Sequence, residues 1–134
     1  MTDRAEAFLE LDGLTKKFGD FTAVRDVGLK ISEGEFFTLV GPSGSGKTTM
    51  IRLLVGMDRP TSGEIRLKGK PLNDVPANKR PTCMVFQNLA LFPHRSVGEN
   101  IEFPLKIAGV APAVRRERAV ALLRQLHLPV DYYD

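Results

Sequence analysis

The sequence predicts an α/β fold with an antiparallel β region near the N-terminus and the start of a helical region near the C-terminus. Three observations predict it. Several short stretches alternate apolar and polar side chains, two runs at 36–40 and 82–87 are continuously apolar, and a helical apolar stripe follows Pro112. The combination is typical of a mixed sheet with helices on it.

The first elements in order are strands. Residues 8–11 (FLEL) alternate and predict a strand, and residues 21–31 alternate less regularly and predict another. Residues 32–35 (SEGE) form a turn. The run FFTLV at 36–40 lacks alternation, which is typical of a strand buried on both faces of a sheet.

A helix is expected next, from Gly46 to Val55, because Gly56 follows it and Pro60 lies just beyond. Residues 63–69 (GEIRLKG) alternate again and predict a strand with one buried face. The run TCMVFQ at 82–87 predicts a second fully buried strand.

The last third is expected to be helical. Residues 91–101 read as a loop that leads into a short helix. Pro112 is suited to the first turn of a final helix, in which the apolar positions follow helical spacing and predict a buried face: Ala119, Leu122, Leu123 and Leu126.

Composition excludes several classes of protein. The 134 residues amount to one domain or part of one, with a net charge of +3 from 19 basic and 16 acidic side chains. The basic run 115–118 is interrupted by Glu117, so we expect no nucleic-acid partner. The single cysteine, Cys83, is expected to be a small core residue.

The sequence also suggests a location for the protein. Its first residues lack the pattern of a signal peptide, so we expect none, and no apolar run comes near the ~20 residues that a membrane helix needs. We therefore expect a cytoplasmic protein, or one held on the inner face of the cytoplasmic membrane by a partner.

One stretch carries specific chemistry. Residues 41–48 (GPSGSGKT) fit the pattern G-x-x-x-x-G-K-[ST], preceded by an apolar run and followed by a helix. Glycines let the backbone N–H groups turn toward phosphate oxygens, and the helix adds its positive end. Lys47 can reach the β- and γ-phosphates, and the Thr48 hydroxyl can ligate Mg²⁺.

This loop together with MVFQNLALFPHRSVGENI at 84–101 resembles the nucleotide-binding subunits of ABC transporters, especially those of bacterial solute importers of the spermidine/putrescine, iron and sugar type. The resemblance runs from about Leu9 to the end of the chain. It implies a P-loop NTPase core, ATP and Mg²⁺ as cofactors, and an ATPase that powers solute import. Residues 36–49 and 91–101 favour the polyamine type.

The resemblance also implies roles for individual residues. Phe18 matches the aromatic residue that stacks on adenine, and Gln87 matches the glutamine that approaches the metal and the attacking water. Residues 88–103 match the surface on which membrane-spanning subunits dock, and His94 there is expected to be a docking residue. The phosphate loop contributes a set of ligands, namely Gly41, Ser43, Gly44, Ser45, Gly46, Lys47, Thr48 and Thr49.

Parts of the family's active site are missing from the sequence. No Asp-Glu pair and no LSGGQ signature occurs, so neither a Walker B strand with its catalytic glutamate nor the signature can be placed. Asp58 ends the loop's own helix, about 15 Å from Lys47. Asp131 follows Pro129, which argues against a central strand, and His127 does not match the family's histidine.

The expected organisation is therefore that of the N-terminal part of a nucleotide-binding domain, cut inside its helical subdomain and inactive alone. Its regions are an antiparallel β region (1–35 and 60–75), the strand–loop–helix (36–58), a glutamine and docking segment (82–103) and the start of the helical subdomain (104–134). The whole protein would form a homodimer or heterodimer of such domains.

Two other readings stay open. A nucleoside or guanylate kinase also carries a GPSGxGK loop, but usually close to its N-terminus, whereas about forty residues precede it here. A GTPase is disfavoured because residues 78–81 (NKRP) fail its base-reading motif at the fourth position. A catalytically dead product that binds nucleotide or only docks to a membrane partner shares every motif with the first reading.

Overall fold

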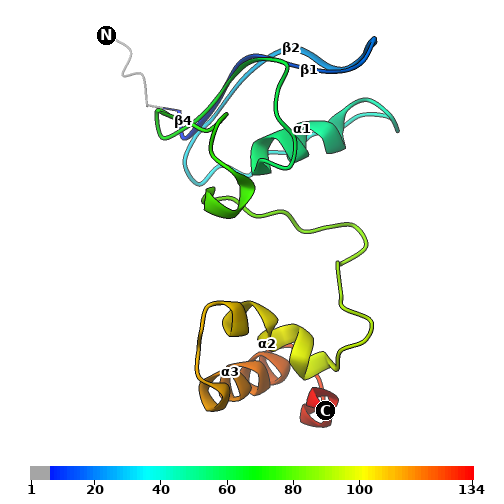
Figure 1. The fold of residues 1–134 in the computed structure, drawn as a ribbon, viewed down its shortest axis with the longest axis vertical. Coiled ribbons are helices and arrows are strands. Elements are labelled where there is room, and N and C mark those ends of the chain that lie inside the picture. Colours follow the sequence, from blue (N-terminus) through cyan, green and yellow to red (C-terminus); the bar gives the residue numbers. More distant parts are fainter. Residues whose placement is uncertain (1–6) are drawn as a thin grey trace. The chain divides into compact units, whose positions relative to one another are not determined.

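The computed structural model describes residues 7–134, which form two compact units divided after Met84 (Figure 1). The first unit contains the sheet and the phosphate loop, and the second, from Val85 to Asp134, is helical. No helix among the described residues is both long and apolar enough to span a membrane.

The first unit is built on a four-stranded antiparallel sheet of order β2-β1-β3-β4. Its strands are β1 (Leu9–Phe18), β2 (Phe21–Ile31), β3 (Ser62–Leu67) and β4 (Lys70–Pro71). The expected strands at 8–11, 21–31 and 63–69 are thus present, and β1 is longer than its alternation indicated. Strands β1 and β2 form a tight hairpin in which Phe18 pairs with Phe21.

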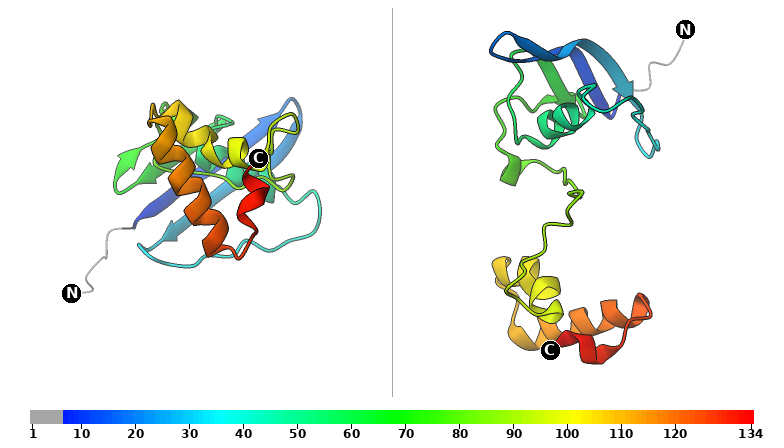
Figure 2. Two further views of the ribbon diagram at one scale, coloured as in Figure 1. Left: turned by 90° about the horizontal axis from the view of Figure 1, so that it is seen from below. Right: turned by 90° about the vertical axis from the view of Figure 1, so that its right-hand side faces the viewer.

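Helix α1 (Lys47–Val55) packs against one face of this sheet, as the right-hand view of Figure 2 also shows. Leu53 of the helix is fully buried with Leu14 of β1 and Ile65 of β3. Because these side chains come from three elements distant in sequence, their burial fixes the helix on the sheet. The predicted helix and its end at Gly56 are confirmed.

Arg80 closes the C-terminal end of α1. It follows a short 3-10 turn, η1 (Ala77–Lys79), and its buried guanidinium donates to the carbonyl oxygens of Leu53 (2.8 Å), Leu54 (3.0 Å) and Val75 (2.8 Å). Burial lowers the pKa of Arg80 from its usual range. The negative end of the helix compensates its charge, since no carboxylate among the described residues pairs with it.

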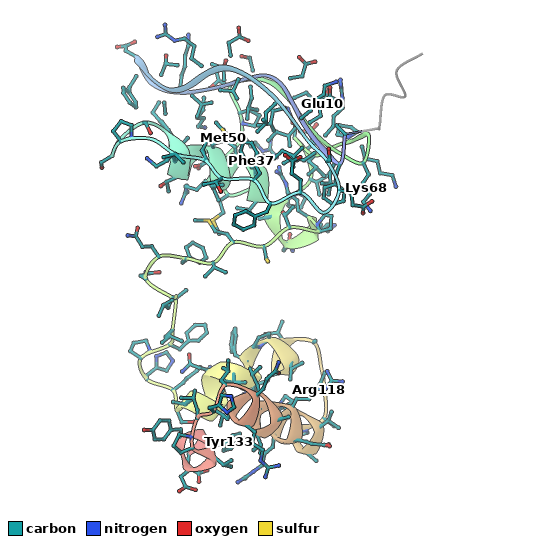
Figure 3. All side chains as sticks on the ribbon, turned by 180° about the vertical axis from the view of Figure 1, so that it is seen from behind. Glu10, Phe37, Met50, Lys68, Arg118 and Tyr133 are labelled. Carbon is teal, nitrogen blue, oxygen red and sulfur yellow. The ribbon has the colours of Figure 1, made fainter. Side chains whose placement is uncertain are left out.

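The second unit consists of α2 (Val97–Ile107), α3 (Pro112–Gln125) and the short turn η2 (Val130–Tyr133). A capping box between Ser96 and Glu99 starts α2. The Tyr133 hydroxyl, labelled in Figure 3, donates to Glu102. Glu102 also accepts from Arg115 Nε at 3.2 Å, so η2 is tied to both helices. On α3, Ala119 and Leu123 are buried as expected, whereas Leu122 and Leu126 are exposed.

Besides the expected burial of Leu122 and Leu126, other sequence predictions are wrong in this structure. The runs 36–40 and 82–87 form neither strands nor buried segments: Phe36 is 94% exposed and Val85 is 85% exposed. Cys83, expected in the core, is exposed as well. A strand buried on both faces needs neighbouring strands and covering layers, and the described residues place neither beside these two runs.

Candidate nucleotide-binding site

The phosphate loop ends at the open N-terminus of α1. Gly46 is the residue before the helix, with φ 89° in the left-handed region, and no side chain caps the helix there. The first turn contains no acidic residue. The first N–H groups of the helix are therefore free to bind an anion, and the positive end of the helix dipole favours one.

Gly46 also brings the loop against the sheet. A Cβ at this position would collide with the backbone carbonyl of Ala23 on β2. Only glycine combines the left-handed backbone with this close approach. The third glycine of the motif thus fixes where the N-terminus of α1 stands relative to the β1–β2 hairpin.

Lys47 lies folded over the loop. Its ammonium donates to the carbonyl oxygens of Gly41 (2.8 Å) and Pro42 (2.6 Å) and to Ser45 Oγ (3.1 Å). The charge is therefore held within the loop, next to the free N–H groups of the helix. Hydrogen bonds to carbonyls are weaker than those between an ammonium and an ionised phosphate, so a phosphate can displace them.

A cavity of ≈ 270 Å³ opens at this place. The run from Gly44 to Thr49 lines it, together with Phe21 and Ala23 of β2. The structure therefore gathers most of the predicted loop ligands, including Lys47, Thr48 and Thr49, around one space. Gly41 takes part through its carbonyl, and Ser43 lies in the exposed part of the loop.

Phe18, the predicted stacking residue, is 49% exposed at the end of β1, with the Lys16 ammonium 4.9 Å from its ring centre. It is not a core aromatic, and it does not line the cavity; Phe21 does. The two rings are cross-strand partners, so they project from the same face of the hairpin. Sequence reasoning missed Phe21, although an aromatic directly across a two-residue turn from Phe18 could have indicated it.

Gln87 is exposed and belongs to the second unit, as do the docking segment 88–103 and the exposed His94. Their predicted roles stay predictions.

The two aspartates considered from the sequence, Asp58 and Asp131, lie outside this cavity. Asp58 pairs with Arg52 Nε at 2.7 Å near the C-terminal end of α1, and this hydrogen bond lowers the pKa of its carboxyl. Asp131 lies in η2. Within residues 7–134, no group of three or more His, Cys, Asp or Glu side chains could hold a metal ion. The cavity thus suits anionic phosphates and supplies no carboxylate of its own.

A glycine-rich loop that ends at the uncapped N-terminus of a helix, with a cavity in front of it, is the arrangement of a phosphate-binding site. The family model for the ABC transporter matches residues 24–133, and the chain belongs to this family.

Relatives and solved structures agree with this family. The spermidine/putrescine import ATP-binding protein PotA of Nitrosospira multiformis is 51% identical over 92% of this chain, and PotA of Pseudomonas aeruginosa is 56% identical over 90%. The chain spans about a third of their length, 34% and 33%.

Among solved structures, the dimeric structure of MJ0796, a bacterial ABC transporter cassette, superposes with a TM-score of 0.78 at 32% identity. The match covers 94% of this chain and 60% of that one. A post-hydrolysis state of the same cassette, bound to ADP and Pi, gives 0.77 at 33% identity, covering 93% and 60%. The predicted fold class, part of an ABC ATPase nucleotide-binding domain, is confirmed.

Proposed function

We propose that this chain binds Mg-ATP and is the ATP-binding part of an ABC transporter that imports a solute, of the polyamine type. The observation that carries the proposal is the uncapped N-terminus of α1, where Lys47 and its neighbours in the loop line one cavity. Kinship with PotA proteins supports ATP as the ligand and polyamine import as the process.

Different residues of the cavity would bind different parts of the nucleotide. The loop from Gly44 to Thr49 would hold the phosphates, with Lys47 exchanging its carbonyl partners for phosphate oxygens. Thr48 supplies a hydroxyl for Mg²⁺, an ion that binds few protein ligands and keeps phosphate oxygens and water around it. When bound, Mg²⁺ would neutralise charge on the phosphates, and Gln87 keeps the role that the family resemblance implies for it.

The base would lie along the β1–β2 hairpin. Phe21 already lines the cavity, and Phe18 projects from the same face beside it. An exposed aromatic ring gains by stacking on a purine, since stacking buries both faces from water. We assign the base contact to this pair of rings.

The partners follow from the family. Residues 88–103 would dock on membrane-spanning subunits at the inner face of the cytoplasmic membrane, and two nucleotide-binding domains would close over ATP. The similar MJ0796 cassette was solved as a dimer. The kinase reading loses its support because the chain belongs to the ABC transporter family.

A pair of glycine variants tests the phosphate site. Gly46→Ala forces a side chain against the Ala23 carbonyl, whereas Gly28→Ala on β2 places its Cβ in open space. Calorimetric titration should find ATP binding lost in Gly46→Ala and kept in Gly28→Ala. Circular dichroism should show both variants folded. Equal ATP affinity in the two folded variants would overturn the assignment.

A further inference from the structure

The end of strand β1 is bonded to the segment that follows helix α1. The Lys16 ammonium donates to the carbonyl oxygen of Arg59 at 2.7 Å. The Lys17 N–H donates to Thr61 Oγ at 2.9 Å, and the Thr61 N–H donates to the carbonyl oxygen of Thr15 at 2.8 Å. Because these hydrogen bonds join stretches that are distant in the sequence, they hold the end of β1 in place relative to the end of α1.

The Lys16 ammonium also lies over the ring of Phe18, 4.9 Å from the ring centre. At this distance the negative face of the ring attracts the charge in a cation–π contact. The Phe18 side chain is nevertheless 49% exposed. One face of the ring is therefore occupied by the ammonium, and a purine that stacks on Phe18 has to use the opposite face.

The charge of Lys16 is not taken up by a carboxylate. Lys16 forms no ion pair within the described residues 7–134. Asp58, next to Arg59 in the chain, is bonded to Arg52 Nε at 2.7 Å. The Arg59 carbonyl fixes the position of the ammonium without neutralising it, so the charge remains available to the Phe18 ring.

We propose that Lys16 is a positioning residue for the base of the nucleotide. It holds the Phe18 ring in one orientation, with one face under the ammonium and the other face free to stack on a purine. This inference rests on the proposed contact between Phe18 and the base. It adds that the ring is oriented before the nucleotide arrives, so less side-chain freedom is lost on binding.

The anchor of this orientation is the Arg59 carbonyl, which follows α1 in the chain. The N-terminus of the same helix would hold the phosphates. Lys16 thus links the ring that would contact the base to the segment that ends the phosphate-binding helix. A residue of this kind acts on base binding and leaves phosphate binding alone.

A double-mutant cycle with adenosine tests the proposal. Lys16→Met keeps a long side chain on β1 and removes the charge and the donor. Calorimetric titration of the purified chain should show adenosine affinity reduced about two- to fivefold in Lys16→Met, the effect expected for an exposed cation–π contact. The same substitution in a Phe18→Ala background should change nothing, because no ring remains to be held.

Three further measurements separate positioning from a general structural effect. Lys16→Arg should keep most of the adenosine affinity, because a guanidinium can donate to the same carbonyl and lie over the same ring. Inorganic tripolyphosphate should bind the parent chain and Lys16→Met equally. Lys17→Met is the matched control, since Lys17 is exposed and its hydrogen bond to Thr61 uses the backbone N–H. Circular dichroism should show that all these variants are folded.

The outcomes distinguish this inference from the base contact on which it rests. Unchanged adenosine affinity in Lys16→Met, with a loss in Phe18→Ala, would overturn the role of Lys16 and leave the base contact standing. Equal losses from Lys16→Met with and without the Phe18 ring, or a Lys16→Arg variant as weak as Lys16→Met, would also overturn it. Weaker tripolyphosphate binding in Lys16→Met would assign Lys16 to the phosphates instead. Unchanged affinity in Phe18→Ala would overturn both the base contact of Phe18 and the inference.

Discussion

The two ends of helix α1 differ in whether side chains bind their unpaired backbone groups. At the C-terminal end, Arg80 donates to the carbonyls of Leu53 and Leu54, and Gly56 leaves room for it, since a Cβ there would lie 2.5 Å from Arg80 Nε. At the N-terminal end no side chain caps the helix, and a cavity opens in front of it. The C-terminal carbonyls are thus bound by another part of the chain, whereas the N-terminal N–H groups are available to a ligand.

This difference shows how a single helix serves structure and function together. Backbone groups at both ends lack partners within the helix. Satisfying the carbonyls internally fixes the position of α1, and leaving the N–H groups open creates a site whose charge suits phosphate. A binding site is thus recognisable as the place where a well-packed element remains incomplete.

The prediction with the largest expected effect concerns ATP hydrolysis at the open end. We propose that the open end holds phosphates, but its cavity is lined by no carboxylate, and Asp58 is bound to Arg52 at the other end. The 134-residue chain alone should therefore bind Mg-ATP without measurable hydrolysis, because general-base assistance is typically worth about 10²–10⁴-fold. Phosphate release by the purified chain measures this, with Lys47→Ala as the control for contamination. Steady release above that control would mean that a carboxylate such as Asp58 or Asp131 reaches the site.

The second prediction concerns the C-terminal end of α1, where Arg80 binds the carbonyls. Arg80→Met leaves buried carbonyls without donors, each at a cost of about 1–3 kcal/mol. Hydrogen exchange of the α1 amides should become roughly tenfold to a hundredfold faster, with the ratio of ATP to adenosine affinity unchanged. Arg52→Met, which removes a more exposed ion pair at the same end, should change exchange far less. Equal acceleration in both variants would show that Arg80 does not secure the helix.

The smallest effect concerns the hairpin beside the open end. Phe18→Ala and Phe21→Ala should each weaken ATP and adenosine alike, by about 1–3 kcal/mol, because stacking acts on the base. The affinity for GTP should fall by a similar factor. Phe36→Ala, an exposed ring that does not line the cavity, is the control in calorimetric titrations. Unchanged binding in Phe18→Ala with a loss in Phe21→Ala would assign the base to the second ring alone.

Sequence patterns predicted the local elements well. The alternation around Ile65 gave a strand because its partner, β1, lies in the same unit and buries that face. The glycine pattern around Gly46 and the lysine after it fixed the loop and the helix start, since these depend on backbone conformation over a few residues.

Features that depend on residues distant in the sequence could not be predicted. The runs 36–40 and 82–87 have strand sequences but no strand beside them among the described residues, and sequence alone does not supply neighbours. Arg80 carries no motif, because its acceptors, Leu53 and Leu54, lie 27 and 26 residues earlier and are backbone atoms. Phe21 was missed for a related reason: its role follows from the hairpin register.

The central claim is that the open end of α1 holds the phosphates of a nucleotide. Calorimetric titration of ATP and adenosine into the parent chain, Lys47→Ala and the control Lys70→Ala tests it most directly. A charge-assisted contact is worth about 1.5–3 kcal/mol, or roughly ten- to over a hundredfold in affinity. We predict that Lys47→Ala loses ATP affinity by this factor and keeps its adenosine affinity. Lys70→Ala should bind both ligands as the parent chain does. An equal loss for ATP and adenosine in Lys47→Ala would contradict it.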